Sequence, residues 1–399
     1  MTVTGTDPFH SPPLAAALRQ PLMLGLFLPL QSGAWSPSTA PRGTTWTFDY
    51  NARLTQMAER QGFDLVFGLA QWMGKGGYGG AMKFREDAND PLLITAGLAA
   101  VTKRILLIST VHILYGWHPL HLAKFGATID RMSGGRWGLN VVTGYKQSEV
   151  EMFGLGLTEH DKRYEMADEF TAIMKRLWQD EEELTFDGQF WKTRRAFVSP
   201  KPLNGRCILV NAASSGAGLA YATRHSDLIF ITSPGGADLD KACETLPAHN
   251  ARIKAQAQAQ GRTIRTIINP HVICRPTAKE ARAQYQSILD HQDPVAADTF
   301  YKTFTGGDQS SWRGNTRDQW VIGGNVHIVG TPDQVVDGFK RLKAAGCDGV
   351  QVNFFDFEPD LAYFGEAVLP LMHQAGLRIP DAPSQSKATS PKPKSRRTT

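Results

Sequence analysis

Short apolar runs recur along the chain and alternate with stretches of helical period. The runs are rich in Val, Ile, Leu and Phe, and they lack the alternation of a strand with one solvated face. They predict eight buried strands, near residues 22–30, 63–70, 105–112, 137–143, 207–213, 228–233, 267–274 and 348–355. Apolar residues at helical spacing predict amphipathic helices, at residues 49–61, 119–133, 160–178 and 332–345.

Strands and helices that alternate in this way are typical of a parallel sheet covered by helices. Eight such strands predict an α/β protein, a (β/α)8 TIM barrel with long insertions at its C-terminal face. A doubly wound open sheet is the alternative. The first predicted strand is not followed by a GxGxxG motif, which argues against the open sheet.

Composition divides the chain into three parts. Residues 21–380 carry the predicted barrel, residues 1–20 form an N-terminal extension, and residues 381–399 have the Ser, Pro, Lys and Thr content of a disordered basic tail. The five basic residues after Asp381 account for the whole net charge of +5. The neutral body lacks the positive footprint of a nucleic-acid-binding protein, so we expect no nucleic-acid partner.

Cysteine spacing and hydropathy bear on the compartment. No run reaches the roughly 18 apolar residues of a membrane span, and the N-terminus does not show the pattern of a signal peptide. The four cysteines are widely spaced and form no CxxC, which favours free thiols over disulfides or a zinc site. We expect a cytoplasmic protein with no membrane partner and no metal.

Three long loops interrupt the predicted repeat, at residues 31–47, 71–90 and 290–326. Loops of this length in a compact domain are usually functional, and we expect 290–326 to be a lid over the barrel mouth. Aromatic residues in these loops either close an apolar pocket or anchor the loops: Trp35, Trp46, Trp72, Tyr78, Trp312 and Trp320. Residues 184–199 predict a hairpin that turns at Asp187-Gly188.

Polar residues at the predicted strand ends are mostly neutral hydrogen-bonding groups, Thr110 and Asn140 among them. Paired carboxylates, a GxSxG elbow and a Walker loop are absent, so a cofactor is expected to carry the chemistry. The segment AASSGAG at 212–218 enters a helix, where its serines form either an anion site or an ordinary N-cap. His112 is equally compatible with a structural role and a site role.

Several segments together resemble the flavin-dependent monooxygenases of the bacterial luciferase superfamily, with the pyrimidine oxygenases and dimethylsulfone monooxygenases most similar. Besides AASSGAG, they are ATIDRMSGGRWG (127–138), LNVVTGYKQSEVEMFG (139–154), EHDKRYEMADEF (159–170) and DLAYFGEAVLPLM (360–372). The resemblance runs from about residue 22 to residue 376 and implies a barrel of the expected type.

The resemblance also implies an activity. Reduced FMN would be delivered by a separate NAD(P)H-dependent flavin reductase, and O2 would be the co-substrate, acting through a flavin (hydro)peroxide on a small S- or N-containing molecule. C–S cleavage of a sulfone or sulfonate and oxidative opening of an N-heterocycle or amide both remain open. A homodimer or homotetramer is implied as well. The alternative functions are flavin binding without turnover and a hydrolase without flavin.

By motif matching, the resemblance places residues in roles. The FMN contacts it implies are Ala70, Gln71, Asn140, Glu149, Arg163, Tyr164, Ser214 and Ser215. Thr110 and Asn140 match the pair beside the flavin N5 and the oxygen pocket, and we place His112 with them as a catalytic candidate. On the substrate side we expect Phe67, Trp72 and Trp312.

Overall fold

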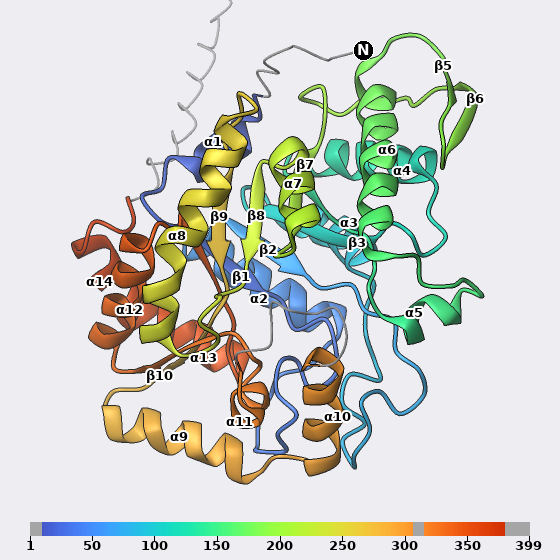
Figure 1. Ribbon diagram of the computed structural model, residues 1–399. Coiled ribbons are helices and arrows are strands. Elements are labelled where there is room, and N and C mark those ends of the chain that lie inside the picture. Colours follow the sequence, from blue (N-terminus) through green and yellow to red (C-terminus); the bar gives the residue numbers. More distant parts are fainter. Residues whose placement is uncertain (1–9, 306–314, 380–399) are drawn as a thin grey trace, which may run out of the picture.

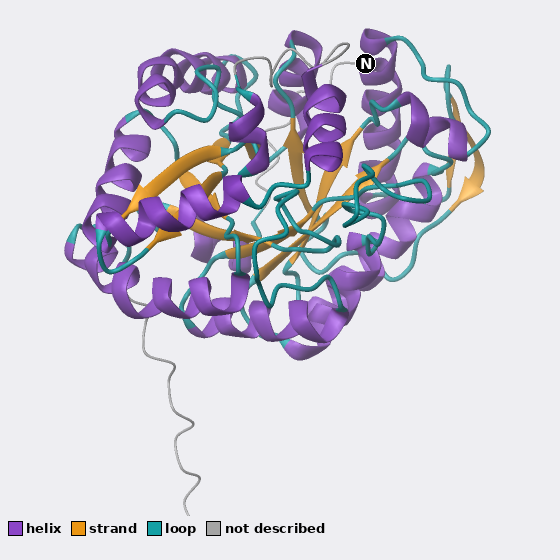
Figure 2. Cartoon of the chain, turned by 90° about the horizontal axis from the view of Figure 1, so that it is seen from below, coloured by secondary structure: helices purple, strands orange, loops and turns teal. Residues whose placement is uncertain are grey.

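A computed structural model of the chain describes residues 10–305 and 315–379. Its centre is a closed barrel of eight parallel strands in the order β1-β12-β9-β8-β7-β4-β3-β2. Figure 1 shows the barrel from the side, and Figure 2 looks toward it from below, with helices around the strands. The predicted TIM barrel is confirmed and the open sheet is wrong, because β1 pairs in register with both β12 and β2.

The barrel strands are short and deeply buried. Every residue of β1, β2, β3, β8 and β12 is buried, which is why the sequence shows continuous apolar runs there. The eight barrel strands are β1 (Met23–Phe27), β2 (Leu65–Gly68), β3 (Leu106–His112), β4 (Trp137–Val142), β7 (Ile208–Ala212), β8 (Leu228–Ile231), β9 (Arg265–Ile268) and β12 (Gly349–Val352).

Helices cover the outside of the barrel and begin at clear start signals, such as Pro119 at the first position of α4 and the Thr331–Gln334 capping box of α12. All four predicted helices are confirmed within two residues at each end. The helices around the barrel are α2 (Phe48–Arg60), α3 (Pro91–Val101), α4 (Pro119–Ser133), α6 (His160–Gln179), α7 (Gly216–His225), α8 (Leu239–Gln258), α12 (Pro332–Ala344), α13 (Phe357–Tyr363) and α14 (Leu369–Gln374), with a π-helical turn, η2 (Phe364–Val368), between the last two.

The remaining elements lie at the two ends of the barrel. The predicted hairpin is confirmed as the antiparallel pair β5 (Leu184–Asp187) and β6 (Lys192–Ala196). Helix α1 (Pro12–Leu18) precedes β1, and α5 (Gln147–Met152) follows β4. Residues 1–9 and the tail from residue 380 lie outside the described residues, so the expected disorder of the tail stays a prediction.

Two sequence expectations need correction. The run at 267–274 is not one strand: it divides at Asn269 into β9, inside the barrel, and β10 (Pro270–Cys274), which pairs instead with β11 (Val326–Gly330). The segment 290–326 is not a plain loop, because it contains α10 (Pro294–Thr305) and α11 (Arg317–Val321). Ala296, Phe300 and Phe304 are at helical spacing, and their burial against other aromatic rings explains the helix.

Helix α9 (Ala278–Asp290), α10 and α11 form one excursion between β10 and β11, and Figure 1 shows α10 and α11 beneath the mouth of the barrel. The β10–β11 pair joins the two ends of this excursion, since Cys274 and Gly330 are register partners. None of the described helices is long and apolar enough to cross a membrane.

Candidate active site

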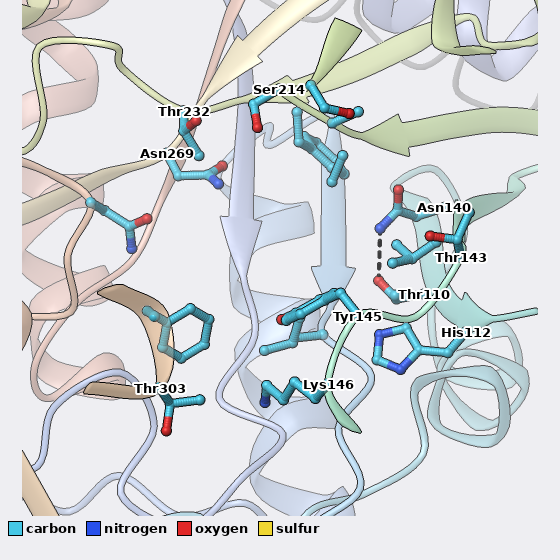
Figure 3. A pocket seen from close by; sticks show the side chains of 18 of the residues that line it. Thr110, His112, Asn140, Thr143, Tyr145, Lys146, Ser214, Thr232, Asn269 and Thr303 are labelled. Atoms are coloured by element: carbon cyan, nitrogen blue, oxygen red, sulfur yellow. Dashed lines mark hydrogen bonds between the residues drawn. The ribbon is translucent and has the colours of Figure 1, made fainter. Parts of the chain in front are cut away.

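A cavity of about 800 Å³ opens at the carboxyl ends of the barrel strands. Figure 3 shows Thr110, His112, Asn140 and Ser214 among the side chains that surround it. Active sites of TIM barrels lie at this end, and the volume suits a cofactor-sized ligand. The cavity is therefore the candidate active site.

Thr110 and Asn140 lie side by side at the cavity wall. They are register partners on β3 and β4, each is 1% exposed, and Asn140 Nδ2 donates a hydrogen bond to Thr110 Oγ1 at 3.0 Å. Asn140 Oδ1 has no partner among the described residues. With its oxygen accepting from Asn140, Thr110 keeps its hydroxyl proton for a ligand, so the pair offers one donor and one acceptor.

An aromatic wall lies deeper in the cavity. The ring centroids of Phe27 and Trp35 are 3.9 Å apart, those of Phe27 and Phe67 are 4.7 Å apart, and those of Phe67 and Phe230 are 4.5 Å apart. All four side chains line the cavity. This wall excludes water and offers flat apolar surfaces to a ring-shaped ligand.

The cavity also has an aromatic roof, which we define as Tyr78, Phe84, Phe300, Phe304 and Trp320. Phe300, Phe304 and Trp320 face the cavity, whereas Tyr78 packs behind them against Phe300 at 5.0 Å between centroids. The loop aromatics thus divide between the two expected roles: Trp35 and Trp320 close the pocket, and Tyr78 anchors its loop.

The start of α7 presents donors that suit an anion, and we refer to it below as the anion site. Ser215 is the N-cap, with its hydroxyl oxygen accepting from the Gly218 amide at 3.1 Å, so the N-cap interpretation is confirmed for this residue. Ser214 and Tyr164 line the cavity beside it, and the first-turn amides of a helix attract negative charge. Burial raises the pKa of Tyr164, and a hydrogen bond with Ser215 opposes the rise.

Arg163 completes the anion site from α6. It is 4% exposed and lines the cavity, and its Nη1 donates to the Gly144 carbonyl at 2.5 Å. Its Nε has no partner among the described residues. Gly216 leaves open space in front of the helix start, because a Cβ there would meet nothing within 4 Å. The site can therefore accept a phosphate-sized anion.

His112, Lys146 and Glu149 form a cluster of ionisable side chains that are at most 9% exposed. Lys146 Nζ lies 3.0 Å from Glu149 Oε1 and 2.9 Å from the Tyr78 hydroxyl, and His112 Nδ1 lies 3.4 Å from Glu149 Oε2. Burial opposes ionisation of Glu149, but the contact with His112 and the charge of Lys146 outweigh it and lower its pKa to about 2. Burial would also lower the pKa of Lys146, yet Tyr78, Tyr145 and Glu149 reverse the shift and raise it.

The structure does not bring every predicted residue to the cavity. Ala70 and Gln71 are buried but do not line it, and Glu149 faces His112 and Lys146 instead. Trp72 is 41% exposed and packs edge-on against Phe153. Trp312 lies outside the described residues. The roles expected for these residues stay predictions.

Sequence reasoning missed two cations that line the cavity, Arg85 and Lys146. Lys146 had a local signal, because Lys and Glu three residues apart meet on one side of a helical turn. Arg85 had none, because it lies in a glycine-rich loop and its contacts come from other loops and from α10.

Comparisons with known proteins decide the family. A family model described as "Luciferase-like monooxygenase" matches residues 23–349. The chain belongs to the luciferase-like monooxygenase family. The resemblance that the motifs predicted is confirmed, and with it the prediction of a flavin-dependent monooxygenase.

Relatives of this luciferase-like chain match over nearly their whole length. The FMNH2-dependent dimethylsulfone monooxygenase of Pseudomonas putida is 32% identical over 368 residues, which cover 90% of this chain and 97% of the relative. Pyrimidine monooxygenase RutA of Pantoea ananatis is 30% identical over 360 residues, which cover 88% and 96%.

Solved structures of similar proteins have the same fold. A riboflavin lyase, crystallised with modified FMN and its substrate riboflavin, superposes with a TM-score of 0.79 at 26% identity and covers 91% of this chain and 94% of its own. The long-chain alkane monooxygenase LadA superposes with a TM-score of 0.77 at 23% identity, covering 90% and 93%, and supports the fold alone.

Proposed function

We propose that this protein is an FMNH2-dependent monooxygenase of a two-component system, which uses O2 to oxidise a small S- or N-containing organic substrate. One observation carries the proposal: in a barrel of this family, the anion site and the Thr110–Asn140 pair share one cavity. Reduced FMN, when bound, supplies the electrons that activate O2. A separate NAD(P)H-dependent flavin reductase is the partner that supplies it.

The residues present fit FMN. Arg163, Tyr164, Ser214 and Ser215 would hold the phosphate, because they combine a buried cation, hydroxyl groups and a helix start. The Nε of Arg163 has no partner among the described residues, and a phosphate oxygen would accept its hydrogen bond.

The other end of the cavity fits the flavin ring. Phe27, Phe67 and Phe230 of the aromatic wall would pack against the ring and keep water out. At the reacting centre, the Thr110 hydroxyl would donate a hydrogen bond and Asn140 Oδ1 would accept one. Both groups are held in place by the fold, so they act as fixed dipoles that need no reorganisation. His112, which contacts Glu149, lines the same cavity and stays a catalytic candidate.

We also propose a compartment and an assembly. All four cysteines are free thiols, and three of them are buried, which supports a reducing cytoplasm. A homodimer or homotetramer stays part of the proposal, to be measured by light scattering.

The function is tested with photoreduced FMN. We expect the protein to bind reduced FMN anaerobically and, on addition of ¹⁸O2, to place one labelled oxygen atom in a product from a panel of sulfones, sulfonates, pyrimidines and amides. A protein that binds no reduced FMN would contradict the proposal. A protein that binds it but yields only hydrogen peroxide across a wider panel would be a flavin-binding protein without turnover.

The anion site has its own test. Arg163→Ala removes a charge-assisted hydrogen bond worth about 1.5–3 kcal/mol, so we expect reduced FMN to bind roughly 10- to 100-fold more weakly. Anaerobic fluorescence titration measures the effect. If the variant folds and keeps wild-type affinity, Arg163 only supports the Gly144 carbonyl and the anion site is misassigned.

A further inference from the structure

Arg85 is a buried cation that lines the cavity. It lies between β2 and α3, is 1% exposed, and has a left-handed backbone with φ of 63°. Its Nε donates to the Ala34 carbonyl at 2.9 Å and its Nη1 to Gln71 Oε1 at 3.3 Å. Its Nη2 has no partner among the residues that the structure describes.

The surroundings of Arg85 are aromatic rather than acidic. Its guanidinium carbon lies 4.7 Å from the ring centroids of Trp35 and Phe300 and 5.1 Å from that of Phe84. Both acceptors that it contacts are neutral, and none of its described neighbours forms an ion pair with it. Burial lowers the pKa of Arg85 to about 10, so it stays charged at neutral pH. A buried charge without a counter-ion is costly unless a ligand provides one.

Carboxylates near the cavity do not fill that role. Glu149 is engaged by Lys146 and His112. Among the described residues that line the cavity, Glu151 is the single carboxylate, and it is exposed on α5. Lys146 has a counter-ion in Glu149, whereas Arg85 has none among the residues that the structure describes.

The position of Arg85 separates it from the anion site. In the barrel order, β7 lies four positions from β1 in either direction, so the segments after β7 and after β1 stand on opposite sides of the mouth. The anion site follows β7, whereas Trp35 follows β1 and Arg85 follows β2. The Thr110–Asn140 pair, on β3 and β4, lies between them.

We propose that Arg85 binds an anionic oxygen group of the substrate, with its free Nη2 completing the contact, and that the substrate class is therefore small organic oxyanions with an apolar body, such as alkyl sulfonates, sulfinates or carboxylates. Trp35 and Phe300, the two rings beside Arg85 that line the cavity, contact the apolar body, and the contact between Arg85 and the oxyanion fixes the direction of the substrate. This inference rests on the proposed function, since it names the substrate class of the same cavity.

The test uses pairs of probes that match in shape and differ in charge. Methanesulfonate and dimethylsulfone differ by an oxygen in place of a methyl group, and butanesulfonate and butyl methyl sulfone form a longer pair. Binding is measured by anaerobic titration calorimetry with the protein saturated with reduced FMN, and again without flavin. No turnover occurs in either state, so the readout does not depend on activity.

We expect wild-type protein to bind each sulfonate more tightly than its neutral partner. Arg85→Met should weaken the binding of the sulfonates by roughly 10- to 100-fold, because it removes a charge-assisted hydrogen bond. It should leave the binding of the sulfones nearly unchanged. Arg85→Lys should keep part of the preference, because it keeps the charge but not the planar fork. Arg42→Met is the matched control: it removes another buried guanidinium, stacked on Phe355 at 4.5 Å and outside the cavity lining.

Several outcomes would overturn the proposal. If neither sulfonate binds saturably, or if the sulfonates bind no more tightly than the sulfones, the substrate does not carry the proposed anionic group. Equal loss of both probe classes in Arg85→Met and in Arg42→Met would make Arg85 a support for its loop. Sulfonate binding that Arg163→Ala abolishes and Arg85→Met spares would place the anion in the phosphate position. If Arg85→Met binds reduced FMN more weakly than wild type does, Arg85 contacts the flavin and not the substrate. If wild-type protein binds no reduced FMN at all, the result contradicts the proposed function instead.

Discussion

Single residues at the strand ends decide what the cavity can do, and some of them could be predicted from the sequence. Thr110 and Asn140 lie in the C-terminal halves of buried apolar strands, and the parallel pairing of β3 with β4 brings them side by side. Arg85 and Lys146 could not be found in this way. Their contacts are with rings and carbonyls from distant segments, and such partners leave no spacing in the local sequence.

Removal of the hydroxyl of Thr110 or the amide of Asn140 should uncouple oxygen use from product. Losing one fixed donor of this kind typically costs about 10²–10³ in rate. We expect Asn140→Ala and Thr110→Val to keep most of their affinity for reduced FMN and to divert its electrons to free hydrogen peroxide. The measurement is the ratio of oxygenated product to hydrogen peroxide per FMNH2 consumed. An unchanged ratio in both variants would remove the pair from the mechanism.

Glu149 should make stability depend on acid pH. Its pKa in the folded protein is about 2, below the usual 4.5, so its contribution is full above about pH 4.5 and is lost as the pH falls toward 2. Glu149→Gln leaves Lys146 buried without a counter-ion, and we expect the free energy of unfolding to drop by about 3–5 kcal/mol near neutral pH. Urea unfolding at several pH values should show this difference shrinking below about pH 4. A difference that does not vary with pH would argue against the ion pair.

At the scale of elements, continuous apolar runs and helix start signals were sufficient to place the barrel strands and the four predicted helices. The division at Asn269 was not visible, because β9 and β10 are both apolar and differ only in which strand they pair with. Helices α10 and α11 were hidden by the glycine-rich stretch between them. Helix α6 packs closely on α7, and two glycines of α7 differ in how much space this packing leaves them.

Gly218→Ala and Gly216→Ala should behave differently although they lie two residues apart on α7. A Cβ at Gly218 would come within 2.6 Å of the Tyr164 hydroxyl and 2.7 Å of Ala213 Cβ, whereas one at Gly216 would meet nothing within 4 Å. We expect Gly218→Ala to cost about 1–3 kcal/mol of stability and to weaken FMN binding, because Tyr164 must move. Gly216→Ala should change stability by no more than about 0.5 kcal/mol. Chemical unfolding compares the two, and equal effects would show that Tyr164 yields freely.

At the scale of the whole molecule, the barrel mouth offers one anion site for a phosphate, at the start of α7, with the flavin ring toward β3 and β4. FMN carries one phosphate, and FAD would add a second phosphate and an adenosine. We therefore expect reduced FMN to bind at least about 10-fold more tightly than reduced FAD, a difference of roughly 1.4 kcal/mol. Anaerobic titration of both flavins checks this, and tighter FAD binding would point to a second site outside the described lining.

The β10–β11 pair fastens both ends of the α9–α11 excursion at neighbouring points. A segment that leaves and returns at one place can change in length or sequence at little entropic cost to the rest of the chain. Phe300, Phe304 and Trp320 come from this segment, whereas Arg163, Ser214 and Ser215 come from the barrel. The surface proposed to contact the substrate can therefore change in evolution while the surface proposed to bind the flavin is kept. We expect sequence divergence among relatives to concentrate between residues 275 and 325.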